Sequence, residues 1–242
     1  MKKIALVFDV DGTITKEDTI FLFFELFGKR KEAEQIYRWA KSNPKRILRE
    51  YGIPEKEIFP SIDIELILKK ILGEKGAIPI EAFENIGKKA EIAEGAKKFL
   101  EYFGKKRQFE VFFITSEYRP IAEAIAKRLG VPEKNIFCTE LKIKRGNVIA
   151  FEGPVMESKE KLTALTQITN RGFAYSRIFA FGDSESDKYF IGEAVRKGGI
   201  GVAVWKNTEL IRFAKPQYVQ NKPDFGELIK IVKKEAEKRG IQ

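Results

Sequence analysis

The sequence has 242 residues, enough for one large domain or for a core domain that carries a smaller inserted one. A single cysteine, Cys138, and the absence of histidine exclude an intramolecular disulfide, a multi-cysteine zinc site and catalysis by imidazole. The net charge is +10, but the two signs alternate along segments such as KKEAEKR, which favours a solvated, heat-stable surface over a nucleic-acid-binding stripe.

The first predicted element is a β-strand over KKIALVF, residues 2–8. This apolar run is too short for the core of a signal peptide, and no later run has the length of a membrane span. We therefore expect a cytoplasmic protein without a membrane partner.

Two aspartates, Asp9 and Asp11, directly follow this strand in the motif DVDGT. Residues i and i+2 of an extended segment face the same side, so both can face one site at the carboxyl end of the strand, where open α/β sheets bind ligands. Two adjacent carboxylates repel unless a cation lies between them, and Mg²⁺ prefers oxygen ligands. Although Asp and Gly are also common in turns, the motif predicts a Mg²⁺ site.

The interval from Asp18 to about Ala93 has helical periodicity and no convincing strand. Segments such as DTIFLFFELFG and IEAFENIGKKAEI place apolar residues at helical spacing, with Gly or Pro at most boundaries. We predict four or five helices that form an all-helical cap over residues 16–92. The core would then consist of residues 1–15 and 93–242.

Four further strands are predicted at EVFFI (110–114), NIFCTEL (135–141), RIFAF (177–181) and IGVAV (200–204), mostly separated by helical patterns. This alternation predicts an α/β fold with a mainly parallel sheet. Alternating residues around Arg145-Gly146-Asn147 predict a projecting β-hairpin. The tail from Asp224 has the pattern of a closing amphipathic helix.

A second acidic cluster, FGDSESD at residues 181–187, directly follows the RIFAF strand. Asp183 and Asp187 could complete the metal site, or they could cap the helix that follows. Because DVDGT also follows a strand, we favour the metal site.

These motifs resemble those of the haloacid dehalogenase-like superfamily of phosphatases, which carry four motifs on a Rossmann-like core. DVDGT resembles the first motif and FGDSESD the fourth. Thr115 in VFFITS resembles the second, and Lys159 in ESKEKLTAL the third, with Lys161 as the alternative. The hairpin and the helical insertion resemble the phosphoserine phosphatase branch.

The resemblance implies a Mg²⁺-dependent phosphatase in which Asp9 attacks phosphorus to form an aspartyl-phosphate and Asp11 is the general acid and base. Mg²⁺ would be held by carboxylate oxygens of Asp9 and Asp183 and by the backbone carbonyl of Asp11. Asp187 would orient metal-bound waters or Lys159 without binding the ion itself. The groups that would hold the phosphoryl oxygens are Thr115, Lys159 and the backbone amides near Gly12 and Ser116.

The expected substrate is a small phosphorylated metabolite, with phosphoserine itself as the alternative. Asp18 stands where phosphoserine phosphatases typically have Glu, and Glu117 where they have Gly. In the cap, Asp18, Arg46 and Arg49 are the expected substrate contacts. Two other functions remain as alternatives to a phosphatase. One is a phosphotransferase of the same family, and the other, from a different class, is a nucleic-acid-binding protein.

Overall fold

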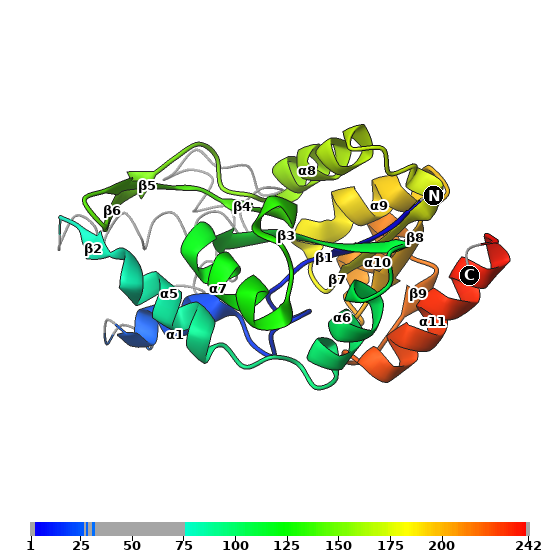
Figure 1. The fold of residues 1–242 in the computed structure, drawn as a ribbon, viewed down its shortest axis with the longest axis horizontal. Helices are drawn as coiled ribbons and strands as arrows, with labels where there is room; N and C mark the ends of the chain where they lie inside the picture. The colour runs from blue at the N-terminus through cyan, green and yellow to red at the C-terminus, as the bar shows by residue number, and fades with distance from the viewer. Residues whose placement is uncertain (1–2, 27, 29–30, 32–75, 241–242) are drawn as a thin grey trace.

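The computed structural model describes residues 3–26, 28, 31 and 76–240 (Figure 1). The predicted cap helices between residues 32 and 75, and with them Arg46 and Arg49, lie outside the described residues. In the described ranges, no helix is both long and apolar enough to cross a membrane.

The main sheet has the strand order β4-β3-β1-β7-β8-β9, and its paired strands are parallel. The five predicted strands and the α/β class are confirmed. The strand β9 was not predicted, because two residues carry no periodic signal, and β3 continues four residues past its predicted end. The bounds are β1 Ile4–Phe8, β3 Phe109–Tyr118, β4 Ile136–Thr139, β7 Ile178–Gly182, β8 Ile200–Ala203 and β9 Tyr218–Val219.

Helices cover both faces of this sheet (Figure 1). Alternate residues of β1 point to opposite faces: Leu6 and Phe8 pack with α6 (Ala96–Gly104) and α11 (Phe225–Lys238), whereas Val7 packs with α8 (Ser158–Asn170) and α9 (Lys188–Arg196). The helix α11 confirms the predicted closing helix. The remaining helices of the core are α7 Arg119–Leu129 and α10 Thr208–Ala214, with short 3₁₀ turns at Glu133–Asn135, Tyr175–Arg177 and Glu185–Asp187.

The predicted hairpin is present as β5 (Leu141–Lys144) and β6 (Asn147–Phe151), which pair antiparallel and project from the main sheet (Figure 1). Its turn residues Arg145 and Gly146 have φ of 52° and 76°, as a tight hairpin turn requires. A strand β2 (Ile78–Pro79) pairs antiparallel with β6. The prediction that residues 18–93 contain no strand is therefore wrong: β2 is two residues long and ends in proline, so alternation could not reveal it.

The insertion leaves and re-enters the core at one place. Thr15 and Ile92 form an antiparallel bridge, the amide of Lys16 donates to the carbonyl of Glu91 (2.9 Å), and the amide of Ala93 donates to the carbonyl of Ile14 (2.8 Å). The helices α1 (Thr19–Leu26) and α5 (Ile80–Lys89) lie within the predicted bounds of the insertion. The domain boundaries at 16 and 92 stay a prediction, since most of the insertion lies outside the described residues.

One close helix crossing anchors the insertion to the core. The helix α5 packs on α7, and a Cβ placed on Gly87 would lie 2.5 Å from the backbone oxygen of Ile121. From α7, the guanidinium of Arg128 donates to the carbonyls of Gly87 (2.7 Å) and Ala90 (2.8 Å), which the end of α5 leaves without helical partners. The helices α5 and α7 are thus held together both by close packing and by hydrogen bonds.

Candidate active site

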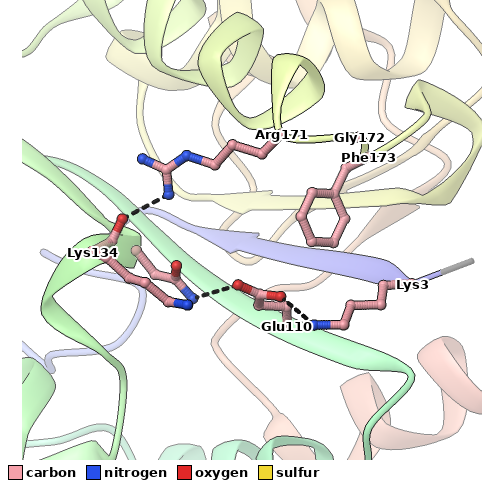
Figure 2. Close-up of a pocket in the computed structure, with 7 residues that line it drawn as sticks. Lys3, Glu110, Lys134, Arg171, Gly172 and Phe173 are labelled. Carbon is pink, nitrogen blue, oxygen red and sulfur yellow. Dashed lines mark hydrogen bonds and ion pairs between the residues drawn. The ribbon is translucent and has the colours of Figure 1, made fainter.

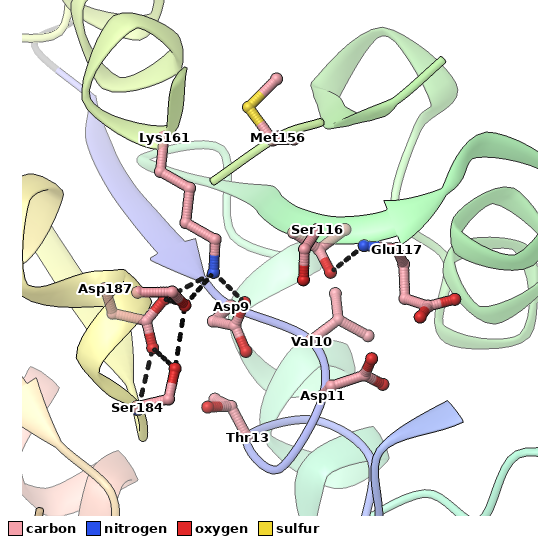
Figure 3. Close-up of polar contacts among 12 residues, drawn as sticks. Asp9, Val10, Asp11, Thr13, Ser116, Glu117, Met156, Lys161, Ser184 and Asp187 are labelled. Atoms are coloured by element: carbon pink, nitrogen blue, oxygen red, sulfur yellow. Dashed lines mark hydrogen bonds and ion pairs between the residues drawn. The ribbon is translucent and has the colours of Figure 1, made fainter. Parts of the chain in front are cut away.

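Three motifs meet at the carboxyl edge of the main sheet (Figure 3). Phe8 of β1 is in register with Phe113 of β3 on one side and Phe181 of β7 on the other. The residues that follow these positions lie side by side, which brings Asp9, Thr115 and Asp183 to one edge. The sheet register is therefore what assembles the site.

A buried ion cluster forms around Lys161. Its Nζ donates to Asp9 Oδ1 (2.6 Å), Asp187 Oδ1 (2.6 Å) and Ser186 Oγ (3.2 Å), and the side chains of Lys161, Asp9 and Asp187 are almost fully buried (Figure 3). Burial alone would lower the pKa of Lys161, but the charges of Asp187 and Asp9 outweigh it and raise this pKa. Lys161 is therefore a permanent cation beside Asp9.

The placement of Lys159 is a correction. Its side chain is exposed on the first turn of α8, whereas Lys161, two residues further along the helix, points to Asp9. A helix turns about 200° over two residues, so only one of these two lysines can face the site. The position predicted for Lys159 belongs to Lys161.

Asp9, Asp183 and Asp187 each offer a carboxylate oxygen within 4.8 Å of the others. Burial and the charge of Asp187 raise the pKa of Asp9 to about 7, and burial with the charges of Asp9 and Asp187 raises the pKa of Asp183 well above its usual range. Only the carboxylates of Asp9 and Asp187 contact Lys161, so the group has more negative charge than one lysine balances. This donor set fits a hard divalent cation such as Mg²⁺. The Asp11 carboxylate is not part of it, and Asp187 belongs to the group itself.

The glycine at position 12 allows the backbone that follows Asp9 to lie close to Asp183. A Cβ on Gly12, which has φ of 68°, would lie 2.6 Å from Asp183 Oδ2. Thr13 then donates through its hydroxyl to Asp183 Oδ1 (3.3 Å). The loop Asp9–Thr13, hereafter the DVDGT loop, is thus shaped to hold Asp183 close to Asp9.

Asp187 also organises the loop that bears Asp183. Its Oδ2 accepts from the amides of Asp183 (3.0 Å) and Ser184 (3.1 Å), as in a helix capping arrangement. The capping interpretation of FGDSESD is therefore confirmed for Asp187, whose other oxygen accepts from Lys161, and the metal-binding interpretation stays a prediction.

The side chain of Asp11 lies apart from this cluster. It accepts hydrogen bonds from the hydroxyl of Thr15 (3.1 Å) and from the amide and hydroxyl of Thr19 (both 3.3 Å). Burial and the neighbouring charges of Glu117 and Asp18 raise the pKa of Asp11 well above its usual range. At neutral pH Asp11 therefore favours the protonated form, which a general acid needs.

Thr115 and Ser116 close the site from β3. The Thr115 hydroxyl is buried and accepts from the amide of Glu117 (3.1 Å), which leaves its own proton available. The carbonyl of Ser116 accepts from Thr139 (2.6 Å), whose oxygen in turn accepts from the amide of Met156 (3.0 Å). This chain of bonds fixes the end of β3 beside the segment that leads to Lys161.

Two residues near the site have features that the sequence analysis did not predict. Trp205, two residues after the end of β8, donates from Nε1 to the carbonyl of Gly12 (2.9 Å) and is 41% exposed. Glu117 is buried although it carries an ionisable carboxyl group, with 2% of its surface exposed. Trp205 follows a strand at the same sheet edge, so the rule that located Asp9 could have flagged it.

A separate hollow of about 580 Å³ lies at the opposite, amino end of β1, where Lys3 precedes the strand (Figure 2). Glu110 on its wall is bound by Lys3 Nζ (2.9 Å) and Asn135 Nδ2 (3.2 Å), and Arg171 donates to the carbonyl of Lys134 (2.7 Å). Many of the polar groups that line this hollow are therefore hydrogen-bonded to one another. The hollow is not part of the site around Asp9.

Comparison with known proteins identifies the family of the chain. The model of the haloacid dehalogenase-like hydrolases matches residues 6–191, well over half of the chain. The chain belongs to the haloacid dehalogenase-like hydrolases. This match runs from within β1 to within α9 and therefore includes Asp9, Lys161 and Asp183.

Within this family the hydrolase is similar to phosphoserine phosphatases. It is 24% identical to the one from Lactococcus lactis, over 82% of each chain, and 23% identical to the one from Archaeoglobus fulgidus, over 84% of this chain. It spans only 52%, about half, of the Archaeoglobus protein's length. A solved structure described as a phospho-aspartyl intermediate analogue of phosphoserine phosphatase superposes with a TM-score of 0.68 at 22% identity, covering 96% of this chain and all of the other, which shows a shared fold.

Proposed function

We propose that this hydrolase is a Mg²⁺-dependent phosphatase that removes phosphate from a small phosphorylated metabolite through an aspartyl-phosphate on Asp9. The observation that carries the proposal is the buried Lys161, which contacts Asp9 and Asp187 while Asp183 lies within metal-binding reach. An isolated buried ion cluster of this kind is costly, and it is expected where charge must be stabilised during a reaction. The names of the similar proteins support a phosphatase.

In the first step, a carboxylate oxygen of Asp9 forms a bond to phosphorus while the bond to the alcohol oxygen breaks. The alkoxide that leaves takes a proton from Asp11. In the second step, Asp11 takes a proton from a water molecule, whose oxygen attacks phosphorus and releases Asp9 and inorganic phosphate. Asp11 therefore ends each cycle in the protonated state in which it began.

The other groups stabilise charge. Lys161 fixes one oxygen of Asp9 and supplies a positive charge beside the transferred phosphoryl group, and the free hydroxyl proton of Thr115 can bind one of its oxygens. Asp9 and Asp183 would hold Mg²⁺, together with the Asp11 carbonyl as predicted from the sequence. When bound, Mg²⁺ neutralises the negative charges of nucleophile and substrate so that they can approach.

The test of the covalent step is Asp9→Asn, measured on 4-nitrophenyl phosphate with Mg²⁺ present. The variant keeps the size of the side chain but lacks the nucleophilic carboxylate, so we expect a loss of at least about a thousandfold in kcat. Thermal unfolding of the same sample checks that it is folded. Activity within tenfold of the wild type would rule out Asp9 as the nucleophile.

Phosphoserine is the first candidate substrate, because the similar proteins are named for it. A screen of phosphorylated amino acids, sugars, nucleotides and glycolytic acids decides whether it leads. Added acceptor alcohols reveal a phosphotransferase, since the phosphoryl group would then appear on the alcohol. Tight, steeply salt-dependent binding of DNA or RNA without phosphatase activity would instead favour the nucleic-acid-binding alternative.

A further inference from the structure

Trp205 makes a hydrogen bond to the proposed active site that the proposed mechanism does not use. Its Nε1 donates to the carbonyl of Gly12 in the DVDGT loop (2.9 Å), and 41% of its surface is exposed. An indole ring has one polar group, which can only donate a hydrogen bond. The single polar group of this side chain is therefore used on the loop that carries Asp9.

The main chain on either side of Trp205 holds the indole in place. The amide of Val204 donates to the carbonyl of Gly182 (2.9 Å), so the chain is still bonded to β7 one residue before Trp205. The carbonyl of Trp205 accepts from the amide of Asn207 (2.8 Å), whose side chain caps α10 by accepting from the amide of Leu210 (3.0 Å). Trp205 thus lies on a short, ordered connection between β8 and α10.

Gly12 is a residue whose backbone orientation needs support from outside. Its φ is 68°, and glycine has no Cβ to restrict rotation about its backbone bonds. The peptide unit between Gly12 and Thr13 is planar, so a hydrogen bond at each end fixes its orientation. Trp205 donates to the carbonyl end, and at the other end the amide of Thr13 donates to the carbonyl of Val10 (3.2 Å).

This peptide unit borders Asp183, a member of the carboxylate group that fits Mg²⁺. A Cβ on Gly12 would lie 2.6 Å from Asp183 Oδ2, and the hydroxyl of Thr13 donates to Asp183 Oδ1 (3.3 Å). A rotation of the unit would therefore change the contacts that hold Asp183 near Asp9. Two carboxylates that share one Mg²⁺ must keep their separation, because this ion demands near-ideal octahedral geometry.

We propose that Trp205 is a positioning residue, whose hydrogen bond to Gly12 keeps the DVDGT loop in the conformation in which Asp9 and Asp183 can share a cation. It acts through the loop and not by contact with the reacting groups. The inference rests on the metal-binding part of the proposed function. Without the bond, the loop would populate other orientations, and the apparent affinity for the cation would fall in proportion to the competent fraction.

The first test is Trp205→Phe, which keeps an aromatic ring but has no N–H. We expect its affinity for Mn²⁺, measured by equilibrium dialysis, to fall at least fivefold. The Mg²⁺ concentration for half-maximal turnover of 4-nitrophenyl phosphate should rise by a similar factor. At saturating Mg²⁺, kcat and KM should stay within threefold of the wild type, because the bound ion then holds the loop. A merely structural role would lower the free energy of unfolding without changing the Mg²⁺ requirement of the folded protein.

A second replacement isolates the hydrogen bond. The amino acid 3-benzothienylalanine has the shape of tryptophan with sulfur in place of the N–H, and in a Trp39→Phe background it enters at position 205 alone. It should weaken Mn²⁺ binding as Trp205→Phe does. The matched control is Phe213→Leu, which changes an aromatic residue of α10 that is 53% exposed and packs on Tyr189. This control should leave Mn²⁺ affinity and the Mg²⁺ requirement unchanged.

The outcomes separate this inference from the phosphatase proposal. Absence of turnover in every protein, with Mn²⁺ binding weakened only by the two replacements of Trp205, would contradict the phosphatase and support the positioning role. A Mn²⁺ affinity and a Mg²⁺ requirement that match the wild type in both replacements would overturn the positioning role, whatever the turnover.

Discussion

Lys161 determines how the proposed nucleophile, Asp9, is positioned before the substrate binds. It is held by two buried carboxylates and a serine hydroxyl, so its ammonium group has no freedom to leave the site. Asp9 is thereby oriented before any ligand arrives, and the protein has already met the entropic cost of ordering these side chains during folding. Without Lys161, Asp9 and Asp187 would face each other as two buried negative charges.

Replacing the buried lysine should affect stability and activity together. We expect Lys161→Met to lower the free energy of unfolding by about 3–5 kcal/mol, because it leaves Asp9 and Asp187 without their cation. Its kcat on 4-nitrophenyl phosphate should fall at least a hundredfold. Denaturant unfolding and steady-state kinetics measure the two effects.

The matched control is Lys159→Met, which makes the same chemical change on the exposed face of the same helix. Its unfolding free energy should stay within about 0.5 kcal/mol of the wild type. Equal effects of both substitutions would contradict the assignment of Lys161.

At the scale of elements, the choice between the two lysines was decided by helix periodicity. The buried residues of α8 are Lys161, Ala164, Leu165 and Ile168, which lie at i, i+3, i+4 and i+7. This pattern is visible in the sequence and places Lys161 on the core-facing side, with Lys159 off it. Comparing the positions of the two lysines with the apolar face of the helix would have selected Lys161.

The main strands were predictable because each is a run of apolar residues buried on both faces of a parallel sheet. Asp9, Thr115 and Asp183 were predicted from their places after apolar runs, and the sheet register brings all three to one edge. The two-residue strands β2 and β9 were not predictable, since their pairing depends on distant partners rather than on their own pattern. The burial of Glu117 beside Asp11 likewise depends on how far β3 extends, which no local signal sets.

The crossing of α5 and α7 should depend on the glycine between them. In an isolated helix, Gly87→Ala would be favourable by roughly 0.5–1 kcal/mol. Here the new Cβ would lie 2.5 Å from the oxygen of Ile121, so the helices must separate, and we expect a net loss of about 1–3 kcal/mol in unfolding free energy.

Gly104→Ala serves as the control, because Gly104 ends α6 and has no atom within 4 Å of a new Cβ. It should be neutral or slightly stabilising in the same denaturant titration. A Gly87→Ala variant as stable as Gly104→Ala would mean that the two helices do not pack this closely.

For the whole molecule, the acidic site contrasts with the net charge of the chain, which is +10. A net positive charge favours the approach of anions such as phosphate esters, whereas the carboxylates at the carboxyl edge of the sheet favour cations. The same carboxylates make the folded protein sensitive to pH when no cation is present.

The metal-free protein should lose stability as the pH rises. Asp9 and Glu117 have ordinary pKa values of 3.8 and 4.5, and in the fold both are raised to about 7, chiefly by burial. Between about pH 4 and pH 7 the folded chain therefore binds more protons than the unfolded chain, so the free energy of unfolding falls as the pH rises through 7. Denaturant midpoints in EDTA should be higher at pH 5.5 than at pH 8.

Adding Mg²⁺ at pH 8 should recover stability, because the ion binds the folded chain alone. The double variant Asp9→Asn, Glu117→Gln should show a weaker pH dependence in EDTA than the wild type. An unfolding midpoint in EDTA that rises from pH 5.5 to pH 8 would contradict the raised pKa values.

The hydrogen bond from Trp205 to Gly12 has an optical consequence. The chain has two tryptophans, Trp39 and Trp205, and the second is bonded directly to the DVDGT loop while half in contact with water. In a Trp39→Phe background, the emission of Trp205 alone would report the polarity and hydrogen bonding of this loop. Stopped-flow fluorescence could then follow cation binding and phosphoryl transfer in real time, without any label attached to the protein or the substrate.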